Sequence, residues 1–411
     1  MKSNISYQES IEILNSLQIQ PKSIEKILFS QALGRILAED IIAQENMPKY
    51  PTSAMDGYAF NSEDIDLLFS SGLKLLSINK AGESEEQICQ KGGCIKTFTG
   101  AKMPKNCDTL ILVEEVKEEG GKVFGLTGVQ IQKGKWIRAV GENYPKGEIL
   151  LKKGSQISPF EVGLLAELNR VFVCVYLKPR IAILSGGDEI IEVGESKREN
   201  TIRSVNNHLI QALCNSMGVE GRIYPLLTDN KSQIKNQVKE ALRECDILIT
   251  TGGASKGDFD YTQEVIKEVC EIQFKGVRMK PGKPVGFGIS KEGQYIFSLP
   301  GFPNSCAVTF MLFVRIVLEK MLGRNSALEP IKAKLTQSIK RTDSRMEFRI
   351  CNLRVQNGIY EVGFWDKKTL QSSVVNNFCS TSALMILQEN GTDIQEGEMV
   401  DILHLDSLIK L

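Results

Sequence analysis

The sequence predicts a multidomain α/β and β protein whose central domain is a three-layer αβα sandwich with a mainly parallel sheet. Three observations support this fold class. The chain has 411 residues, which is too long for one typical domain. Residues 180–323 alternate short apolar runs with segments of helical period, as parallel sheets with crossover helices do. Residues 58–137 and 326–411 carry short β-type runs, many bounded by glycine, which favours two smaller β-rich domains.

Composition excludes several classes of function. Lys+Arg and Asp+Glu number 50 each, and a net charge of zero argues against a general nucleic-acid-binding protein. The most apolar run, residues 307–318, is too short to span a bilayer, and residues 1–10 lack the apolar core of a signal peptide. With two histidines and no Cys-x-x-Cys pair, a zinc site is not expected. We expect a cytoplasmic protein whose cysteines are all reduced: Cys89, Cys94, Cys107, Cys174, Cys214, Cys245, Cys270, Cys306, Cys351 and Cys379.

Changes of pattern and proline-rich joints divide the chain into four domains. They are an N-terminal α+β domain, an inserted β-rich domain, the αβα domain and a small C-terminal β domain; the boundaries are 1–50 plus 138–178, 51–137, 179–325 and 326–411. In the first domain, apolar residues at helical spacing predict three helices, over 7–17, 22–33 and 159–170. In the last domain, β-type runs predict strands over 331–335, 347–350, 360–364 and 399–405.

Two loops of the inserted domain carry candidate functional side chains. Asp56 stands in an Asp-Gly pair, a tight-turn signal; it either only makes the turn or presents a carboxylate at a loop tip. Thr99 places a hydroxyl beside a glycine, where hydroxyls bind phosphate but also end strands. Where the chain leaves the insert, Arg138 and Glu142 form either a surface ion pair or an anion contact.

The αβα domain should place four loops at one edge of its sheet. We predict strands over 180–184, 222–227, 247–249, 287–289 and 295–299, helices over 206–217 and 231–244, and a further helix that follows the 300–305 segment and ends near Leu322. Ligands of such sheets bind outside the carboxyl ends of the strands. The loops expected to converge there are 185–189, 228–230, 251–260 and 300–305.

The stretch from 246 to 261 (DILITTGGASKGDFDY) has two interpretations. It reads as a buried strand that opens into a glycine-rich loop before a helix. Asp258 or Asp260 would then simply cap the helix. Alternatively, the loop amides bind an anion while the carboxylates hold a cation, as in a metal-assisted phosphate site.

Amides, carboxylates and lysines share this predicted edge. The carboxylates are Glu189, Asp229 and Asp260, while Lys280 and Lys283 stand among prolines that stiffen their loop. Amides and lysines that hold oxyanions, with carboxylates that hold Mg²⁺, fit phosphoryl or pyrophosphate chemistry. The sequence has no P-loop motif and offers no Ser/His/Asp set, so neither of those enzyme classes is expected. Expected substrate contacts are Arg138, Ser185, Gly186, Gly187, Gly252, Gly253, Ser255, Pro300, Gly301 and Pro303.

Seven segments, in their order and spacing, resemble the molybdopterin molybdenumtransferases, the MoeA type in bacteria and the E domain of gephyrin in animals. Each segment is modest alone, but together they run through nearly the whole chain. They are LGRILAED (33–40), SAMDGYA (53–59), TGA (99–101), LSGGDE (184–189), TGGASKGDFDY (251–261), KPGKP (280–284) and LPGFP (299–303).

The resemblance implies an elongated homodimer in which the N-terminal domain dimerises. The active site would lie between the αβα domain of one subunit and the inserted domain of the other. It implies that Mg²⁺ assists cleavage of adenylylated molybdopterin, with release of AMP and uptake of molybdate. The site residues it carries over are Asp56, Thr99, Glu189, Asp229 and Asp260, with Lys280 and Lys283 as oxyanion-holding lysines. We expect Asp56, Glu189, Asp229 and Asp260 as the metal ligands, and the molybdopterin adenylyltransferase and acceptor molybdoenzymes as protein partners.

The sequence also departs from the pattern of this family. Asn143 stands where many relatives have an acidic residue, and Phe302 and Asn304 stand where they often have Asn and Val. Two alternatives remain at this point. One is a molybdopterin adenylyltransferase, whose fold resembles residues 180–323 alone. The other is a non-catalytic scaffold of the same fold that binds a protein partner.

Overall fold

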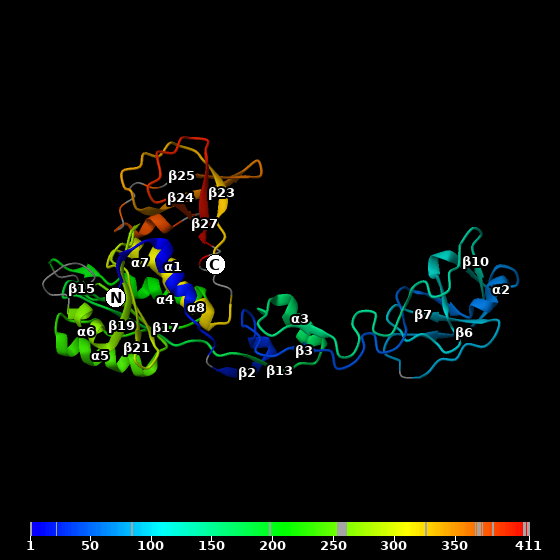
Figure 1. Ribbon diagram of the computed structural model, residues 1–411. Coiled ribbons are helices and arrows are strands. Elements are labelled where there is room, and N and C mark those ends of the chain that lie inside the picture. The colour runs from blue at the N-terminus through cyan, green and yellow to red at the C-terminus, as the bar shows by residue number, and fades with distance from the viewer. Residues whose placement is uncertain are drawn as a thin grey trace. The chain divides into compact units, whose positions relative to one another are not determined.

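The computed structural model describes residues 2–21, 23–83, 85–196, 199–252, 261–324, 327–365, 367, 371, 373–379, 382–405 and 408. Contacts group the chain into two compact units (Figure 1). The first unit comprises residues 1–27, 34–38 and 174–411, and the second comprises 28–33 and 39–173. The four domain boundaries given above stay a prediction. No helix among the described residues is long and apolar enough to cross a bilayer.

A seven-stranded sheet forms the centre of the first unit, counting the described residues. Its order is β1 (Lys2–Ile5), β19 (Cys270–Val277), β21 (Gly286–Ser290), β22 (Tyr295–Leu299), β18 (Ile247–Thr251), β14 (Ile181–Ser185) and β17 (Gly221–Ile223). Only the β19–β21 and β21–β22 pairs are antiparallel. In the parallel part, Ile247 lies opposite both Ile181 and Tyr295. The mainly parallel sheet predicted from the alternating pattern is therefore confirmed.

Helices cover both faces of this sheet because its strands are apolar on both sides (Figure 1). Ile181 and Ile183 of β14 belong to one core, whereas Ala182 and Leu184 belong to the other, as the two-residue period of a strand requires. The first core receives α1 (Tyr7–Ser16), α4 (Asn206–Ser216), α7 (Pro303–Thr309) and α8 (Arg315–Met321), the last two joined by a π-helical turn at Phe310–Val314. The second core receives α5 (Lys231–Glu244) and α6 (Tyr261–Val269).

The predicted helix over 22–33 is wrong. The segment forms β2 (Ile24–Leu28), which pairs with β13 (Phe172–Tyr176), and a 3-10 turn at Phe29–Gln31. Exposed and half-buried residues alternate along β2, so its environment has the period of a strand. Pairing with β13, distant in sequence, thus overrides a weak local helical pattern. The other two helices of this part form as predicted, over Tyr7–Ser16 and, in α3, over Pro159–Glu167.

The inserted segment of the second unit is a six-stranded sheet with its own core. The strands are β8 (Thr109–Leu112), β5 (Gly57–Phe60), β7 (Gly93–Thr97), β6 (Leu73–Asn79), β10 (Lys122–Gly125) and β9 (Val116–Glu119), in that order, with the short helix α2 (Ile65–Phe69). Two short pairs connect the ends of the insert: β4 (Thr52–Ser53) with β11 (Ile137–Arg138), and β3 (Ile41–Ile42) with β12 (Ile149–Leu151). The β-rich insert predicted from glycine-punctuated runs is confirmed.

A second six-stranded sheet, within the first unit, contains the C-terminal strands and one short strand from the centre of the chain. Its order is β20 (Met279–Lys280), β24 (Met346–Gln356), β25 (Ile359–Gly363), β23 (Ile331–Leu335), β27 (Met399–His404) and β26 (Ser382–Leu387), and β26 also pairs with β24. Lys280 lies opposite Glu347 in the parallel β20–β24 pair. This pairing brings one of the predicted site lysines to the C-terminal sheet.

Candidate functional site

The loops after β14 and β17 are locked together by their backbones. Gly186 forms a parallel bridge with Leu227. The Leu227 amide donates to the Ser185 carbonyl at 2.9 Å, and the Gly187 amide donates to the Leu227 carbonyl at 3.1 Å. A Cβ on Gly186 would lie 2.2 Å from the Leu227 carbonyl oxygen. Only glycine fits at this position, because the obstructing atom belongs to the backbone and cannot rotate away.

The ends of β18 and β22 come to the same edge. Gly252 has φ +84°, and a Cβ there would lie 2.9 Å from the Gly186 carbonyl oxygen. A Cβ on Gly301 would lie 3.7 Å from the Gly252 Cα. Asn206, the first residue of α4, donates from Nδ2 to the Gly301 carbonyl at 2.9 Å and to Thr251 Oγ1 at 3.4 Å. The convergence of strand-end loops expected from the topology is therefore present among the described residues.

Two of the predicted carboxylates stand on these loops. Glu189 and Asp229 are both exposed. The Asp229 amide donates to Asp188 Oδ1 at 3.1 Å, which ties the loop after β14 to the loop after β17. Gly187 has φ +139°, a conformation that residues with side chains rarely adopt, and a Cβ there would lie 2.6 Å from a carboxylate oxygen of the flexible Glu189 side chain. Glu189 and Asp229 thus reach one edge of the sheet, where carboxylates can meet a cation.

Three predicted site residues, Gly253, Ser255 and Asp260, lie outside the described residues, as do Asp258 and the rest of that loop. Within the described part of the chain, no three His, Cys, Asp or Glu side chains are grouped to hold a metal ion. The four-carboxylate metal site stays a prediction.

A pocket of about 650 Å³ opens beside this edge and contains both predicted lysines. Four segments line it, the 279–284 loop, the start of α7, β24 and the 371–377 segment: Met279, Lys280, Pro281, Gly282, Lys283, Pro284, Phe302, Asn304, Ser305, Arg345, Glu347, Phe348, Arg349, Ile350, Gln371, Ser373 and Asn377. We call this the anion pocket. Gly282 has φ +106°, and a Cβ there would lie 2.5 Å from Thr309 Cγ2, so the lysine loop packs directly on α7.

Positive charge exceeds negative charge in the anion pocket. Glu347 is the one acidic residue among its described lining residues. Arg349 donates to Glu347 from Nε and Nη2, both at 2.9 Å, and Lys280 Nζ lies 3.8 Å from the same carboxylate. Arg345 is paired with Asp343, and its side chain holds the pKa of Asp343 well below its usual range. Lys283 is exposed and has no ion-pair partner in the described part of the chain. The pocket is suited to an oxyanion.

The loop between β22 and α7 connects the anion pocket with the strand-end edge. Gly301 lies at the edge, whereas Phe302, Asn304 and Ser305 line the pocket. Pro303 begins α7, as proline often does at the first helical position. Pro300 and Pro303 therefore bracket a loop that serves both regions. A substrate with a phosphate group and a second anionic partner could use both at once.

In the inserted domain, the structure brings Asp56 and Thr99 together. Asp56 Oδ1 accepts hydrogen bonds from the Thr99 amide at 2.8 Å and from Thr99 Oγ1 at 2.7 Å. These bonds, the backbone one first, lower the pKa of Asp56, because they favour its charged form. The Asp56 carboxylate is exposed and stays ionised at neutral pH. Arg138 is exposed on β11, and the Glu142 carboxylate accepts from the Ala139 amide at 2.8 Å.

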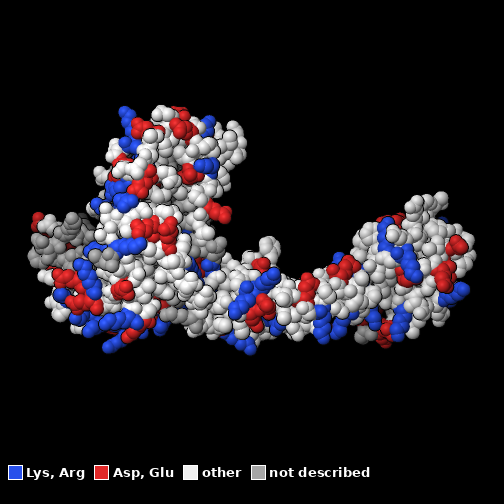
Figure 2. All heavy atoms as spheres, in the orientation of Figure 1, with Lys and Arg blue, Asp and Glu red and all other residues white. Residues whose placement is uncertain are grey.

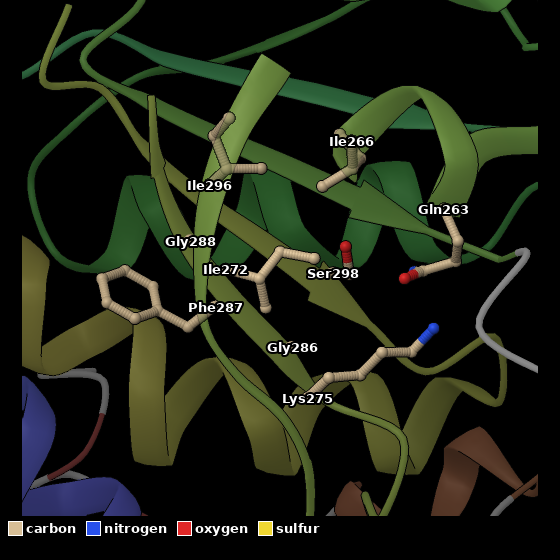
Figure 3. A pocket seen from close by; sticks show the side chains of 9 residues that line it. All are labelled: Gln263, Ile266, Ile272, Lys275, Gly286, Phe287, Gly288, Ile296 and Ser298. Atoms are coloured by element: carbon tan, nitrogen blue, oxygen red, sulfur yellow. The ribbon is translucent and has the colours of Figure 1, made fainter. Parts of the chain in front are cut away.

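A second cavity is too small for a substrate. It holds about 10 Å³ under α6 and is lined by Gln263, Ile266, Ile272, Lys275, Gly286, Phe287, Gly288, Ile296 and Ser298 (Figure 3). That is about the space of one water molecule. On the surface, basic and acidic side chains are interspersed over the visible face of each unit (Figure 2), as expected from a net charge of zero.

Several pocket residues were missed from the sequence. Arg345, immediately before β24, and Glu347 and Arg349 within it alternate with apolar residues, a spacing that places charged side chains on one side of this segment. That period-two run of charges was a signal that the segment has a polar, functional face. Gln371 gave no such signal, and Asn304 stood out only as a departure from the family pattern, because the hydrogen bond between these two residues joins parts of the chain that are distant in sequence.

Comparison with known proteins gives the following similarities. Residues 5–169 match the family described as the MoeA N-terminal region (domain I and II), and residues 182–320 match a probable molybdopterin binding domain. A molybdopterin molybdenumtransferase of Haemophilus influenzae is 30% identical over 390 residues, which are 93% of this chain and 94% of that protein. One of Staphylococcus epidermidis is 29% identical, covering 98% and 96%. The crystal structure of a molybdopterin biosynthesis moeA protein from Pyrococcus horikoshii is 30% identical with a TM-score of 0.81, covering 98% of this chain and all of that one.

Proposed function

The chain belongs to the family of molybdopterin molybdenumtransferases, enzymes of molybdenum cofactor biosynthesis, and we propose that it transfers molybdate to adenylylated molybdopterin with release of AMP. One observation carries this proposal. The anion pocket combines Lys283, which has no ion-pair partner among the described residues, with three further cations and adjoins an edge where four strand-end loops converge. The pocket suits molybdate, and the edge suits a phosphorylated pterin.

The alternative of a molybdopterin adenylyltransferase is not favoured. That interpretation needs only residues 180–323, whereas the similarity to curated relatives spans 93% of the chain and includes residues 5–169. A purely structural scaffold would not need an oxyanion pocket with a cation left unpaired in the described part of the chain.

We propose that Mg²⁺ takes part and is held by Glu189, Asp229 and Asp260 with Asp56. The exposed carboxylates of Glu189 and Asp229 at one sheet edge support this, because Mg²⁺ prefers carboxylate oxygens. When bound, the ion would neutralise charge on the pyrophosphate link and its leaving group. In this proposal Lys280 and Lys283 orient molybdate, and the loops of Gly186 and Gly252, which pack closely on each other, bind the pterin phosphate.

We propose that the protein works as a homodimer. The second unit exposes large apolar side chains, as expected of a surface that is covered in an oligomer. Phe160 of α3 is 86% exposed, and the others include Leu33, Ile149, Val171 and Phe172. Replacing Phe160 by glutamate should therefore shift the protein toward monomer in sedimentation analysis. An unchanged sedimentation coefficient would count against this face.

In such a dimer, Asp56 of one subunit would serve the pocket of the other. Complementation tests this arrangement. Asp56→Asn and Asp260→Asn variants, each expected to be inactive alone, are mixed and allowed to exchange subunits. A site shared between subunits should restore about a quarter of wild-type activity, because half of the dimers are mixed and each has one intact site. No recovery would show that both residues act within one subunit.

The reaction itself is tested with adenylylated molybdopterin, Mg²⁺ and molybdate, measuring AMP and metal-loaded pterin. Molybdate-dependent AMP release is expected, and Asp260→Asn should abolish it in a folded protein. Tungstate in place of molybdate establishes which oxyanion is used. AMP release at a rate that does not depend on the oxyanion would contradict the proposal. We further propose, from the resemblance, a cytoplasmic location with the adenylyltransferase and acceptor molybdoenzymes as partners.

A further inference from the structure

Asn304 connects the anion pocket to a segment of the C-terminal part of the chain. It lies in the first turn of α7 and is 2% exposed. Its Nδ2 donates to the Val374 carbonyl at 2.7 Å and to the Gln371 carbonyl at 3.2 Å. One buried amide thus joins two points of a segment about 70 residues away along the chain. We call the described residues 371 and 373–378 the wall segment.

The wall segment needs such a connection. Its described residues belong to no strand, and their regular structure is the short 3-10 turn Val375–Phe378. The bonds within the segment are long, with the Val374 amide 3.3 Å from the Gln371 carbonyl and the Asn377 amide 3.3 Å from the Val374 carbonyl. The two carbonyls that Asn304 binds therefore gain a donor from a well-packed helix.

The polar lining of the anion pocket consists of two chemically different sets of residues. Lys280 and Lys283 place cations on the lysine loop, Arg349 places one on β24, and Arg345 places one immediately before that strand. The other polar lining residues are neutral: Asn304 and Ser305 on α7 with Gln371, Ser373 and Asn377 on the wall segment. A tetrahedral oxyanion gives up water on all sides when it enters. Neutral donors must therefore face the oxygens that the cations do not reach.

A second observation separates Asn304 from an ordinary core amide. Its Oδ1 is buried and accepts no hydrogen bond from a described residue. A buried acceptor without a partner costs stability, so packing alone would favour an apolar side chain of similar size. The two bonds made by Nδ2 are what the asparagine adds.

We propose that Asn304 is a positioning residue for the anion pocket. It holds the wall segment at the distance from the four cations that allows the pocket to bind its oxyanion substrate. This inference rests on the proposed function, since it concerns affinity for the molybdate that the enzyme consumes. Asn304 acts through Gln371 and its neighbours.

The test compares two substitutions with a matched control. Asn304→Val removes both donated bonds at similar volume. Asn304→Asp also removes them and adds a negative charge beside the oxyanion. The control is Thr309→Val, which deletes a buried hydroxyl of the same helix that donates only within it, to Ser305 and Cys306 at 2.8 and 3.0 Å.

We expect Asn304→Val to raise the Michaelis constant for molybdate about tenfold while kcat stays within about twofold. Asn304→Asp should raise it further, and Thr309→Val should leave it unchanged. Amide hydrogen exchange at 373–378 should become faster in both Asn304 variants, in protein without any ligand. If Asn304 had a merely structural role, its replacement would lower the amount of active enzyme and leave the Michaelis constant for molybdate unchanged.

An unchanged Michaelis constant for molybdate in Asn304→Val would overturn the inference. So would an equal rise in Thr309→Val, which would indicate general loosening of α7. If the wild-type protein shows no molybdate-dependent turnover, the proposed function fails separately. In that case, direct calorimetric titration with molybdate decides the inference, and equal affinity of wild-type and Asn304→Val proteins would refute it.

Discussion

The buried ion pair between Arg349 and Glu347 allows a quantitative test of the anion pocket. The two side chains are 13% and 7% exposed, and two hydrogen bonds of 2.9 Å join them. Arg349→Met keeps the length of the side chain but leaves the Glu347 carboxylate buried without its main partner. Such uncompensated charges cost about 3–5 kcal/mol. Lys280, whose side chain is 42% exposed and 3.8 Å away, recovers about 1 kcal/mol at most. We expect a net loss of about 2–4 kcal/mol.

The same strand supplies the control. Arg354 of β24 also forms two bonds to a glutamate, Glu361, at 3.0 and 2.8 Å, but its side chain is 50% exposed. It also lies 4.4 Å from the ring centre of Trp365. An exposed pair and an exposed cation–π contact together are worth about 1 kcal/mol. Arg354→Met should therefore cost clearly less than Arg349→Met.

Native-state hydrogen exchange in β24 and β26 is the suitable assay, since a multidomain chain does not unfold in two states. The double variant Arg349→Met, Glu347→Gln should regain most of the lost stability, because the orphaned charge is gone. The double variant should not regain affinity for molybdate, because the anion pocket lacks the Arg349 cation in both variants. Equal losses for Arg349→Met and Arg354→Met, or no recovery in the double variant, would refute the reasoning.

Three further predictions follow from single contacts. Lys283→Ala should change the free energy of unfolding by less than about 0.5 kcal/mol but weaken molybdate binding at least about tenfold in calorimetry. Thr99→Val removes a bond that lowers the pKa of Asp56, so this pKa should rise, and the acid limb of the pH–rate profile should move to higher pH; an opposite shift would contradict it. The stability that this carboxylate contributes is present above its unfolded pKa and lost as the pH falls through its folded pKa. Gly186→Ala should lower the free energy of unfolding by about 1–3 kcal/mol, because the added methyl carbon would lie 2.2 Å from its nearest neighbour. Gly301→Ala should have the melting temperature of the wild type, because the corresponding distance is 3.7 Å.

The central sheet could be predicted from the sequence because its signal is local. Ile181 and Ile183 face one layer of helices and Ala182 and Leu184 the other, so the first four positions of β14 are all apolar. The following Gly-Gly pairs then mark the strand ends. Since carboxyl ends of parallel strands share an edge, the loops with Glu189 and Asp229 could be placed together without coordinates.

The helix predicted over 22–33 and the walls of the anion pocket show where this reasoning stops. Ile24–Leu28 becomes a strand only because β13, far along the chain, pairs with it. The lysine loop could be identified from its prolines, but β20 is two residues long and its partner β24 lies 67 positions away. The tether from Asn304 to Val374 is equally non-local. Local periodicity contains no information about such pairings.

These non-local pairings also give the C-terminal strands a role in the site. Lys280 is placed by β20, which is an edge strand of the C-terminal sheet. Arg349 comes from β24 and Arg345 from the position before it, and the neutral lining of the pocket includes Gln371. Phe348 and other residues of this sheet share one core with the helices of the αβα layer. The C-terminal strands are thus part of the anion pocket's construction, because removing them would take away two of its four cations and the partner strand that positions a third.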